Sequence, residues 1–275
     1  MLVGYQGVQG SYSEVAVIRY FGERDYTEMQ YVGFPAMIQD VAYGKLDYAV
    51  FPVENTTTGL ISRTYDLFQH YDIHVIGEVN IPIHHHLIGL PGAGLQDIRE
   101  VYSHPEALSQ CQAFLDANPQ IKPVVYEDTA LAVRYISGQN DLSKAALASR
   151  RAAEFYEMKV ICESVYDNAA NMTRFLIVTA KDETVADGNK ISIMLTLPHV
   201  PGALYNALGI FASKNINVVK LESRPIRGKV FEYCFYIDFS GNLSEPDVAE
   251  ALRRLEYDSL DLKIFGNYRE AERTV

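Results

Sequence analysis

The chain has 275 residues, of which 48% are hydrophobic and 21% charged, so it is long enough for two globular domains with a sizeable core. Its formal net charge of −11 argues against nucleic-acid binding, which requires a basic surface, and means that an anionic ligand needs strong local attraction. Three scattered cysteines, Cys111, Cys162 and Cys234, share no metal-ligand spacing, and we interpret them as reduced thiols of a cytoplasmic protein. The N-terminus has no basic start and the chain has no long apolar stretch, so we expect no signal peptide and no membrane contact.

The first part of the chain is predicted to alternate strands and helices. A strand over residues 2–5 leads through a glycine loop to a helix whose start, Ser11 with Glu14, has the spacing of a capping box. An apolar stripe over residues 34–41 indicates a second helix. Further strands are expected over residues 48–53, 73–90, 98–102, 123–126, 145–148 and 160–165. This alternation predicts a mostly parallel sheet with helices on both faces, in which ligands bind beyond the carboxyl ends of the strands.

Polar side chains follow the predicted buried strand over residues 48–53. Glu54 and Asn55 stand directly at its end. The three consecutive threonines 56–58 supply more hydroxyl groups than one helix cap requires, ahead of the helix expected over residues 60–67. We therefore expect the surplus hydroxyls, with the carboxylate and the amide, to face a ligand.

A second capping box is predicted where Ser103 and Glu106 flank Pro105 at a helix start, and capping alone would explain Ser103. Gln110 is expected about two turns into the same helix, where an ordinary surface position is the alternative. The three histidines 84–86 lie in a strand-like segment, in which at most two of their side chains share a face. Without neighbouring cysteines or acidic clusters, they predict no metal site, and we place them near a hinge.

A polar segment stands just before the predicted buried strand over residues 175–179. Within it, Thr173 can donate or accept a hydrogen bond, and Arg174 can form a bidentate contact with a carboxylate. A polar turn entering a strand is the alternative interpretation. Several predicted helices begin with Ser, Thr or Asp at strand ends, and their free N–H groups are expected to attract anions. We predict a small polycarboxylate held between two lobes by helix N-termini and Arg174.

The C-terminal part has a different pattern. Residues 181–190 are polar, contain Gly188 and lack an apolar stripe, which predicts a linker. The elements expected beyond it are a strand over 191–197, a helix over 202–213, strands over 216–223 and 230–239, a helix over 245–255 and a strand over 260–265. This β-α-β-β-α-β order is typical of a ferredoxin-like plait.

Five short motifs resemble those of prephenate dehydratase, in the same order and spacing. They are Gly10-Ser11-Tyr12-Ser13, Pro52-Val53-Glu54-Asn55-Thr56, Ser103-His104-Pro105, Gln110-Cys111 and Asn171-Met172-Thr173-Arg174-Phe175. The resemblance implies a two-lobed α/β catalytic domain over residues 1–180, like type II periplasmic binding proteins. It also implies conversion of prephenate to phenylpyruvate with loss of carbon dioxide and water, in phenylalanine biosynthesis, without a metal or cofactor. Thr56 stands where the family usually has serine. No helical mutase segment precedes Met1, so the chain resembles the monofunctional form.

The resemblance also implies roles for single residues. Thr173 would donate a proton or a hydrogen bond to the leaving hydroxyl group. The other residues with catalytic roles, which orient the substrate and polarise that hydroxyl group, would be Glu54, Asn55, Ser103 and Gln110. The residues expected to bind the substrate are Arg174, Ser11, Thr56, Asn171 and Phe175.

Two C-terminal motifs, Pro201-Gly202-Ala203-Leu204 and Leu221-Glu222-Ser223-Arg224-Pro225, resemble the ligand-binding motifs of the ACT regulatory domain. The resemblance covers residues 191–275 and implies that phenylalanine binds where two such domains meet, as an end-product inhibitor. The residues expected to bind it are Gly202, Ala203, Leu204, Glu222, Ser223, Arg224 and Pro225. A ligand shared by two domains requires a homodimer or a homotetramer. Without the resemblance, Gly202 would be a helix-start glycine and Arg224 a solvated charge.

Two other functions stay open at this point. Arogenate dehydratase has the same fold and reaction, with an amino acid side chain on the substrate, and the sequence does not separate the two. A non-catalytic small-molecule sensor built on the same lobes is the other alternative. Thr173 and the Glu54-Asn55 pair argue against a sensor, which needs no polar group aimed at a leaving oxygen.

Overall fold

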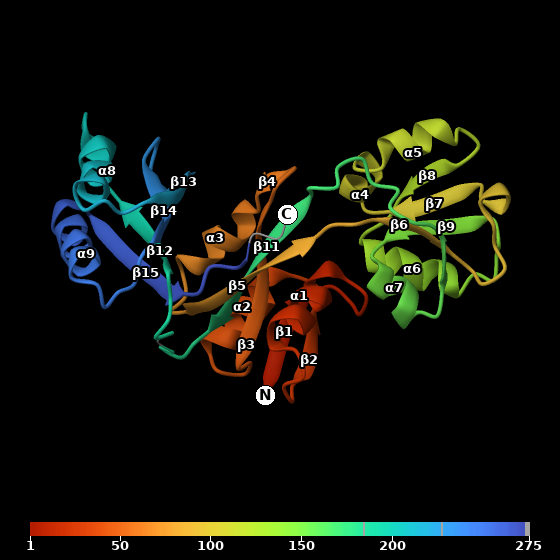
Figure 1. Cartoon of the computed structure of the whole chain (residues 1–275), viewed down its shortest axis with the longest axis horizontal. Coiled ribbons are helices and arrows are strands. Elements are labelled where there is room, and N and C mark those ends of the chain that lie inside the picture. The colour runs from red at the N-terminus through yellow and green to blue at the C-terminus, as the bar shows by residue number, and fades with distance from the viewer. Residues whose placement is uncertain (184, 227, 273–275) are drawn as a thin grey trace.

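The computed structural model describes residues 1–183, 185–226 and 228–272. Thr184 of the expected linker, and Arg227 and residues 273–275 of the expected C-terminal domain, lie outside the described residues. Three α/β units follow one another along the long axis of the molecule (Figure 1). The first lobe lies in the middle, between the second lobe and the C-terminal domain.

The first lobe is built on one mixed sheet with the strand order β2-β1-β3-β11-β5, and β4 pairs with β3. Its elements are β1 (Leu2–Gln6), α1 (Tyr12–Phe21), β2 (Thr27–Tyr31), α2 (Phe34–Ala42), β3 (Tyr48–Asn55), β4 (Gly59–Leu60), α3 (Ser62–Phe68), β5 (His74–Pro82) and β11 (Met172–Thr179). Helix α1 covers one face of the sheet, where Val17 and Phe21 pack on the strands. Helices α2 and α3 cover the other face, where the expected apolar stripe of α2 is buried.

The second lobe repeats this plan with the strand order β10-β6-β9-β7-β8. Its elements are β6 (His86–Gly89), the 3₁₀ helix η1 (Leu95–Asp97), β7 (Glu100–Ser103), α4 (Pro105–Ser109), α5 (Gln112–Ala117), β8 (Lys122–Val125), α6 (Thr129–Ser137), β9 (Lys144–Ala148), α7 (Arg150–Phe155) and β10 (Lys159–Cys162). The predicted two-lobed α/β fold, like that of type II periplasmic binding proteins, is confirmed.

The prediction of mostly parallel sheets is wrong in detail. The chain crosses between the lobes at residues 83–85 and returns over residues 163–171. Strand β11 then enters the first sheet antiparallel to both β3 and β5. In the second sheet β6 runs antiparallel to β9 and β10, while β7 runs parallel to β8 and β9. Each sheet is therefore mixed because the strand that follows a crossing between the lobes, β11 in the first sheet and β6 in the second, runs antiparallel to its neighbours.

The C-terminal domain has the predicted β-α-β-β-α-β order. Its elements are β12 (Lys190–Thr196), α8 (Ala203–Ser213), β13 (Val218–Pro225), β14 (Tyr233–Ser240), α9 (Pro246–Asp258) and β15 (Asp261–Tyr268), and its sheet has the order β13-β14-β12-β15. Helices α8 and α9 cover one face of this sheet. The other face packs on the first lobe, where the ring centroid of Tyr236 lies 4.8 Å from that of Tyr65 and Phe265 lies 6.0 Å from Phe68. Aromatic packing thus joins the domain to α3.

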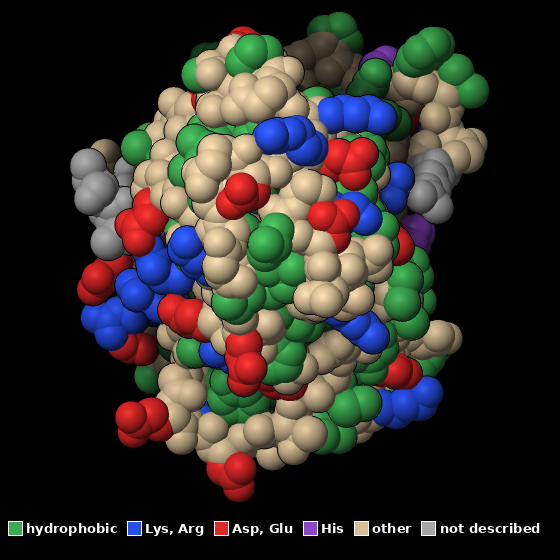
Figure 2. All heavy atoms as spheres, turned by 90° about the vertical axis from the view of Figure 1, so that its right-hand side faces the viewer, with side chains coloured by type: hydrophobic (Ala, Val, Ile, Leu, Met, Phe, Trp, Pro, Cys, Tyr) green, Lys and Arg blue, Asp and Glu red, His purple; other side chains and the backbone are tan. Residues whose placement is uncertain are grey.

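Viewed from the end of the second lobe, Lys and Arg side chains lie interspersed with Asp and Glu, and no broad basic patch is formed by the described residues on this face (Figure 2). Within the part of the chain that the structure covers, no helix has both the length and the apolar character needed to cross a bilayer.

The two lobes contact each other where α7 meets the loop before α1. The Ser149 hydroxyl donates to the Gly10 carbonyl at 2.6 Å, and Arg151 pairs with the buried Glu14 at 3.0 Å. Gly10 has a φ of +90°, and a Cβ there would lie 2.7 Å from the Cα of Ala152. Only glycine fits this contact without displacing α7.

Gly10→Ala is therefore expected to lower the free energy of unfolding by about 1–3 kcal/mol more than a matched control, because the added methyl group forces the lobes apart. The control is Gly44→Ala, which also has a positive φ, of +72°, but has nothing within 4 Å of the added Cβ. Urea denaturation of both variants measures the difference. Equal losses would show that backbone strain, and not the contact with Ala152, accounts for the glycine.

Candidate active site

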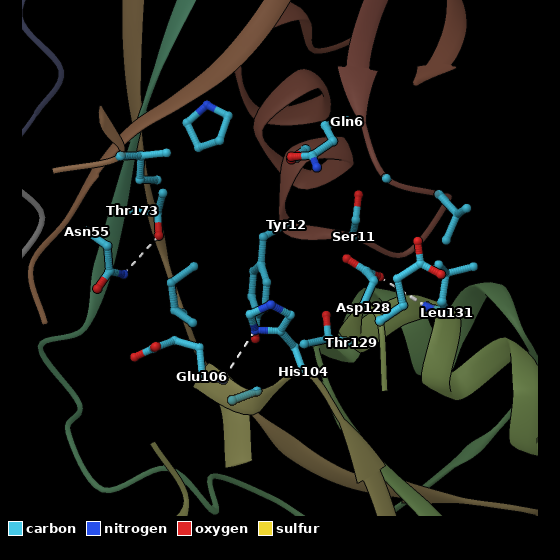
Figure 3. Close-up of a pocket in the computed structure, with 18 of the residues that line it drawn as sticks. Gln6, Ser11, Tyr12, Asn55, His104, Glu106, Asp128, Thr129, Leu131 and Thr173 are labelled. Atoms are coloured by element: carbon cyan, nitrogen blue, oxygen red, sulfur yellow. Dashed lines mark hydrogen bonds between the residues drawn. The ribbon is translucent and has the colours of Figure 1, made fainter. Parts of the chain in front are cut away.

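A cleft of about 630 Å³ lies between the two lobes (Figure 3). The first lobe contributes the loop and helix start after β1, the end of β3 and the start of β11. The second lobe contributes the starts of α4 and α6, and the crossing between the lobes adds Ile83 and His85. The site thus combines strand ends and helix N-termini from both lobes, where a ligand of an open α/β sheet is expected.

Thr173 faces this cleft from β11, with its side chain almost fully buried. Its hydroxyl oxygen accepts a hydrogen bond of 3.0 Å from the Asn55 amide (Figure 3). The Asn55 amide oxygen accepts from the backbone N–H groups of Thr57 and Thr58, so its NH₂ group must point toward Thr173. Since the Thr173 oxygen is the acceptor, its own proton has no partner among the described residues and is available to a ligand.

Asn171 does not line the cleft but contacts Asn55, the partner of Thr173. Its amide oxygen accepts a second hydrogen bond from the Asn55 NH₂ group, at 2.8 Å. Both protons of that NH₂ group are therefore assigned, one to Asn171 and one to Thr173. The expected substrate-binding role of Asn171 becomes, in this geometry, that of a residue that orients Asn55.

Arg174 and Glu54 are placed differently from expectation. Strand β3 extends through Asn55 and β11 begins at Met172, so these residues are paired strand residues and not parts of a turn. Successive side chains of a strand point to opposite faces. Arg174 therefore lies behind the sheet, away from the cleft, with its guanidinium 2.8 Å from Glu54 and 2.8 Å from Asp238 of the C-terminal domain. The expectation that Arg174 holds a substrate carboxylate and that Glu54 orients the substrate is corrected by this placement.

Three more predicted residues lie outside the cleft. Ser103 is fully buried and its hydroxyl donates to the Leu147 carbonyl at 2.6 Å. Phe175 belongs to the core against α1. Thr56 is exposed, and its hydroxyl donates to the Ala170 carbonyl and accepts from the Met172 N–H, which ties down the returning chain. These side chains support the fold around the site, so the corresponding catalytic and binding assignments are corrected as well.

The helix starts also differ in detail. Helix α3 begins at Ser62, so no helix N-terminus lies at Thr56. Helix α4 is capped by His104, whose Nδ1 accepts from the Glu106 N–H, and not by Ser103. It ends at Ser109, which puts Gln110 at its C-terminus with the side chain lining the cleft. Because α4 is this short, Gln110 lies in the cleft, where the resemblance predicted it.

The start of α1 keeps its predicted cap. The Ser11 hydroxyl accepts from the Glu14 N–H at 3.3 Å, and Ser11 lines the cleft as expected. The next two residues, Tyr12 and Ser13, also line the cleft, and their backbone N–H groups have no partner in the described part of the chain. Free N–H groups in the first turn of a helix bind anions. This helix start is therefore the place in the cleft best suited to a carboxylate.

The charges of the cleft are opposite to those expected around an anion. Of the described residues, no lysine or arginine lines it, whereas Glu106, Glu127 and Asp128 do. The Asp128 carboxylate accepts from the N–H groups of Ala130 and Leu131, so it caps α6 and engages two of the donors of that helix start. Attraction for an anion must come from backbone N–H groups and neutral side chains. No group of three potential metal ligands occurs among the residues described.

His85 is a cleft residue that the sequence did not reveal. It lies in the first crossing between the lobes, as the hinge prediction placed it, but its side chain is buried in the cleft. Its Nε2 lies 3.1 Å from the Gln110 amide oxygen, and its Nδ1 lies 3.1 Å from the Tyr12 hydroxyl. Burial lowers the pKa of His85 to about 4, so the ring is neutral near pH 7. Nothing in the run of three histidines distinguishes this one as the cleft residue.

The C-terminal domain has a hollow of about 380 Å³, lined among others by Ala203, Leu204 and Phe235. Gly202 precedes α8 with a φ of +85°, which favours glycine, and stands between Pro201 and Ala203, which line this hollow. The second expected ligand-binding motif, residues 221–225, lies on β13, so its side chains alternate between the two faces of the strand. Ser223 and Pro225 are exposed, and Glu222 is half-buried. Arg224 forms a bidentate ion pair with Asp66 of α3, so it contacts the first lobe and is not solvated.

Together, a two-lobed α/β domain with a polar cleft and a ferredoxin-like plait define a ligand-binding unit joined to a second, smaller domain. The chain matches the prephenate dehydratase family over residues 3–183 and the ACT domain family over residues 191–257. It therefore belongs to the prephenate dehydratase family.

Curated relatives agree with this assignment. Arogenate dehydratase/prephenate dehydratase 2 of Arabidopsis thaliana is 36% identical over 281 residues, which cover 97% of this chain and 72% of the relative. The bifunctional chorismate mutase/prephenate dehydratase of Aquifex aeolicus is 34% identical over 98% of this chain and 74% of the relative.

Two solved structures are also similar over nearly the whole chain. Prephenate dehydratase from Arthrobacter aurescens, in complex with L-Phe, has a TM-score of 0.90 and 28% identity, covering 98% of this chain and 90% of the other. A protein described as GqqA, a novel type of quorum quenching acylases, has a TM-score of 0.90 and 29% identity, covering 99% of both chains.

The low pKa of His85 predicts a pH-dependent stability. Between about pH 6.5 and 4 the unfolded chain binds a proton at this residue that the folded protein does not, so stability falls as the pH is lowered through this range. A shift of this size corresponds to roughly 3 kcal/mol at most. The free energy of unfolding, measured by urea denaturation at both pH values, is expected to fall less in His85→Gln than in the unmodified protein. Equal falls would contradict the low pKa.

Proposed function

We propose that this protein converts prephenate to phenylpyruvate, as a carbon–oxygen lyase of the cytoplasm. The observation that carries the proposal is the hydroxyl group of Thr173, which faces the cleft, accepts from Asn55 and keeps its own proton for a ligand. Membership of the prephenate dehydratase family and the C-terminal ACT domain support the same reaction. The three cysteines are free thiols, which is compatible with a reducing compartment.

The reaction requires few catalytic groups from the enzyme. Prephenate is a dianion whose ring carries a carboxylate and, para to it, a hydroxyl group. When the bond to the carboxylate breaks, its electron pair enters the ring and the hydroxyl group leaves with its bonding pair, so the ring becomes aromatic. The departing oxygen needs a proton or a strong hydrogen bond. Thr173 is the donor in this proposal, and Asn55 fixes the direction of its proton.

The remaining groups of the cleft hold the substrate. A carboxylate of prephenate is placed at the free N–H groups of Tyr12 and Ser13, at the start of α1. Gln110 is fixed by the neutral ring of His85 and presents its amide to the cleft. A neutral histidine suits this role because it holds Gln110 without adding a charge that changes with pH.

Arogenate is a second candidate substrate, and one observation favours it. The cleft is lined by the carboxylates of Glu106 and Glu127 as well as Asp128, and the amino acid side chain of arogenate carries an ammonium group that such carboxylates attract. Prephenate carries a keto group at the same place. Comparison of kcat/KM for the two substrates, in the unmodified protein and in Glu127→Gln, separates them, because only the use of arogenate should suffer from the lost charge.

Acyl transfer is less compatible with the cleft than elimination. An acylase needs a nucleophile beside a general base. In the described structure, the hydroxyl groups of Ser11 and Thr173 bond to the α1 backbone and to Asn55, and neither contacts a histidine. The similarity to the protein described as a quorum quenching acylase is therefore treated as a similarity of fold.

Thr173→Ala is expected to lower kcat by roughly 10²–10⁴-fold, the usual loss when a general acid is removed, with a smaller change in KM. The reason is that Thr173 contacts the leaving oxygen mainly as it departs. Thr173→Ser keeps the hydroxyl group and is the matched control, expected to retain most of the activity. Phenylpyruvate formation from prephenate is followed by absorbance, with circular dichroism to show that both variants fold. An unchanged kcat in a folded Thr173→Ala variant would contradict the role.

Phenylalanine is proposed as an inhibitor that binds at the hollow beside Ala203 and Leu204, between two copies of the chain. The exposed side chains of Val230, Phe231 and Tyr233 near this edge of the domain leave an apolar surface for a second copy. We expect added phenylalanine to lower the rate of phenylpyruvate formation and to raise the melting temperature. Sedimentation should give a dimer or tetramer. A monomer whose activity ignores phenylalanine would contradict this part of the proposal.

A further inference from the structure

Two consecutive residues of β11 connect different parts of the molecule. Thr173 faces the cleft, and Arg174 faces the C-terminal domain across the other side of the sheet. The Nη1 group of Arg174 donates to Asp238 of β14 at 2.8 Å, which is its shortest aligned hydrogen bond. Its contact with Glu78 of the first lobe is 3.5 Å long. A third carboxylate, that of Glu54 on β3, lies 2.8 Å from Nη2, so Arg174 bridges its own lobe and the C-terminal domain.

Asp238 is held in place from its own side. It is only 3% exposed, and the Ser192 hydroxyl donates to its other carboxylate oxygen at 2.5 Å. Ser192 is in turn bonded to the Tyr268 hydroxyl. Burial alone would raise the pKa of Asp238, but the charges of Arg174, Lys220 and Lys190 hold it below its usual range. The carboxylate therefore remains ionised and keeps its pair with Arg174 over the working pH range.

A second pair crosses the same boundary. Lys190 at the start of β12 donates to both carboxylate oxygens of Glu78 on β5, each at 3.0 Å. Two of the three carboxylates around Arg174, those of Glu78 and Asp238, are therefore engaged with the C-terminal sheet, and the third is Glu54 of the first lobe. A displacement of that sheet changes the contacts of Arg174.

The pairing of β11 with β3 is irregular directly after Arg174. Its register shifts between Arg174 and Phe175, whereas the pairing with β5 is regular there. A register shift of this kind bends the strand locally. The contacts of Arg174 therefore act at a bend one residue beyond Thr173, which pairs with Asn55.

We propose that Asp238 is a positioning residue for catalysis, which holds Arg174 and so sets the position of Thr173 in the cleft. Strand β14 carries Asp238 toward one end and Tyr233 and Phe235, which line the hollow of the ACT domain, toward the other. A ligand in the hollow thus acts on the strand that carries Asp238. The Arg174–Asp238 pair then transmits the change to the leaving-group donor. This inference rests on the proposed dehydratase function.

The test compares Asp238→Asn with Asp66→Asn in the full chain. Asp66 forms the other ion pair between the first lobe and the C-terminal domain, with Arg224, and has no contact with β11 among the described interactions. In Asp238→Asn, kcat on prephenate is expected to fall by about 10–100-fold with little change in KM, since a displaced reacting group costs turnover. In Asp66→Asn, kcat should stay within about twofold of that of the unmodified enzyme, because the half-buried Asp66–Arg224 pair contacts neither β11 nor the cleft in the described structure.

Phenylalanine separates coupling from simple loss of structure. Calorimetry should show that Asp238→Asn still binds phenylalanine, while the inhibition that phenylalanine causes is weakened by about tenfold relative to Asp66→Asn. A merely structural role for Asp238 would weaken binding and inhibition together. If both variants were inhibited as strongly as the unmodified enzyme, the proposal would be wrong.

A double variant covers the case in which Asp238→Asn fails to fold because a buried arginine has lost its partner. Arg174→Gln with Asp238→Asn removes both charges, and we expect a folded enzyme with lowered kcat and weak inhibition by phenylalanine. A double variant inhibited like the unmodified enzyme would overturn the proposal.

If the unmodified enzyme acted on neither prephenate nor arogenate, the proposed function would fail together with this inference. If the enzyme were active but Asp238→Asn and Asp66→Asn had equal kcat and equal inhibition, this inference alone would be refuted.

Discussion

The site depends on the alternation of side chains along β11. Because the strand is paired on both sides from Thr173 onward, Thr173, Arg174 and Phe175 point to alternating faces. One face of the sheet carries Thr173 in the cleft and, next along the strand on that face, a core residue against α1. The other gives a charge buried against the C-terminal domain. Three adjacent residues thus serve the cleft, the domain contact and the core, and none could exchange its role without a shift of the strand by one residue.

The second constraint is electrostatic. A chain with a net charge of −11 holds its anionic site without a lysine or arginine among the described lining residues. Backbone N–H groups at a helix start carry partial positive charge in a fixed direction and do not need a counter-ion. Arg174, the cation that the sequence placed in the site, neutralises buried carboxylates behind the sheet instead. The cleft stays polar, and the buried charges stabilise the contact between domains.

Most of the fold could be predicted from local patterns. The strands with apolar runs, the capped helix start at Ser11 and the C-terminal plait all follow from periodicity and capping. The end of β3 could not be located, because Glu54 and Asn55 have weak strand preference and become strand residues only through pairing. The edge strand β2 is mostly exposed and has only Met29 and Tyr31 as an apolar pattern. The partner of Arg174 lies 64 residues away in another domain, so no local pattern could reveal it.

The C-terminal domain packs on the first lobe, and no hydrogen bond or ion pair between the described residues joins it to the second lobe. The second lobe lies at the far end of the molecule and is joined to the first by the two chain crossings and by the contacts of α7 with Gly10 and Glu14 (Figure 1). The cleft therefore has one wall on the sheet that contacts the C-terminal domain and the other wall on the second lobe. A displacement of the C-terminal domain would reach Thr173 through β11, without any change in the second lobe.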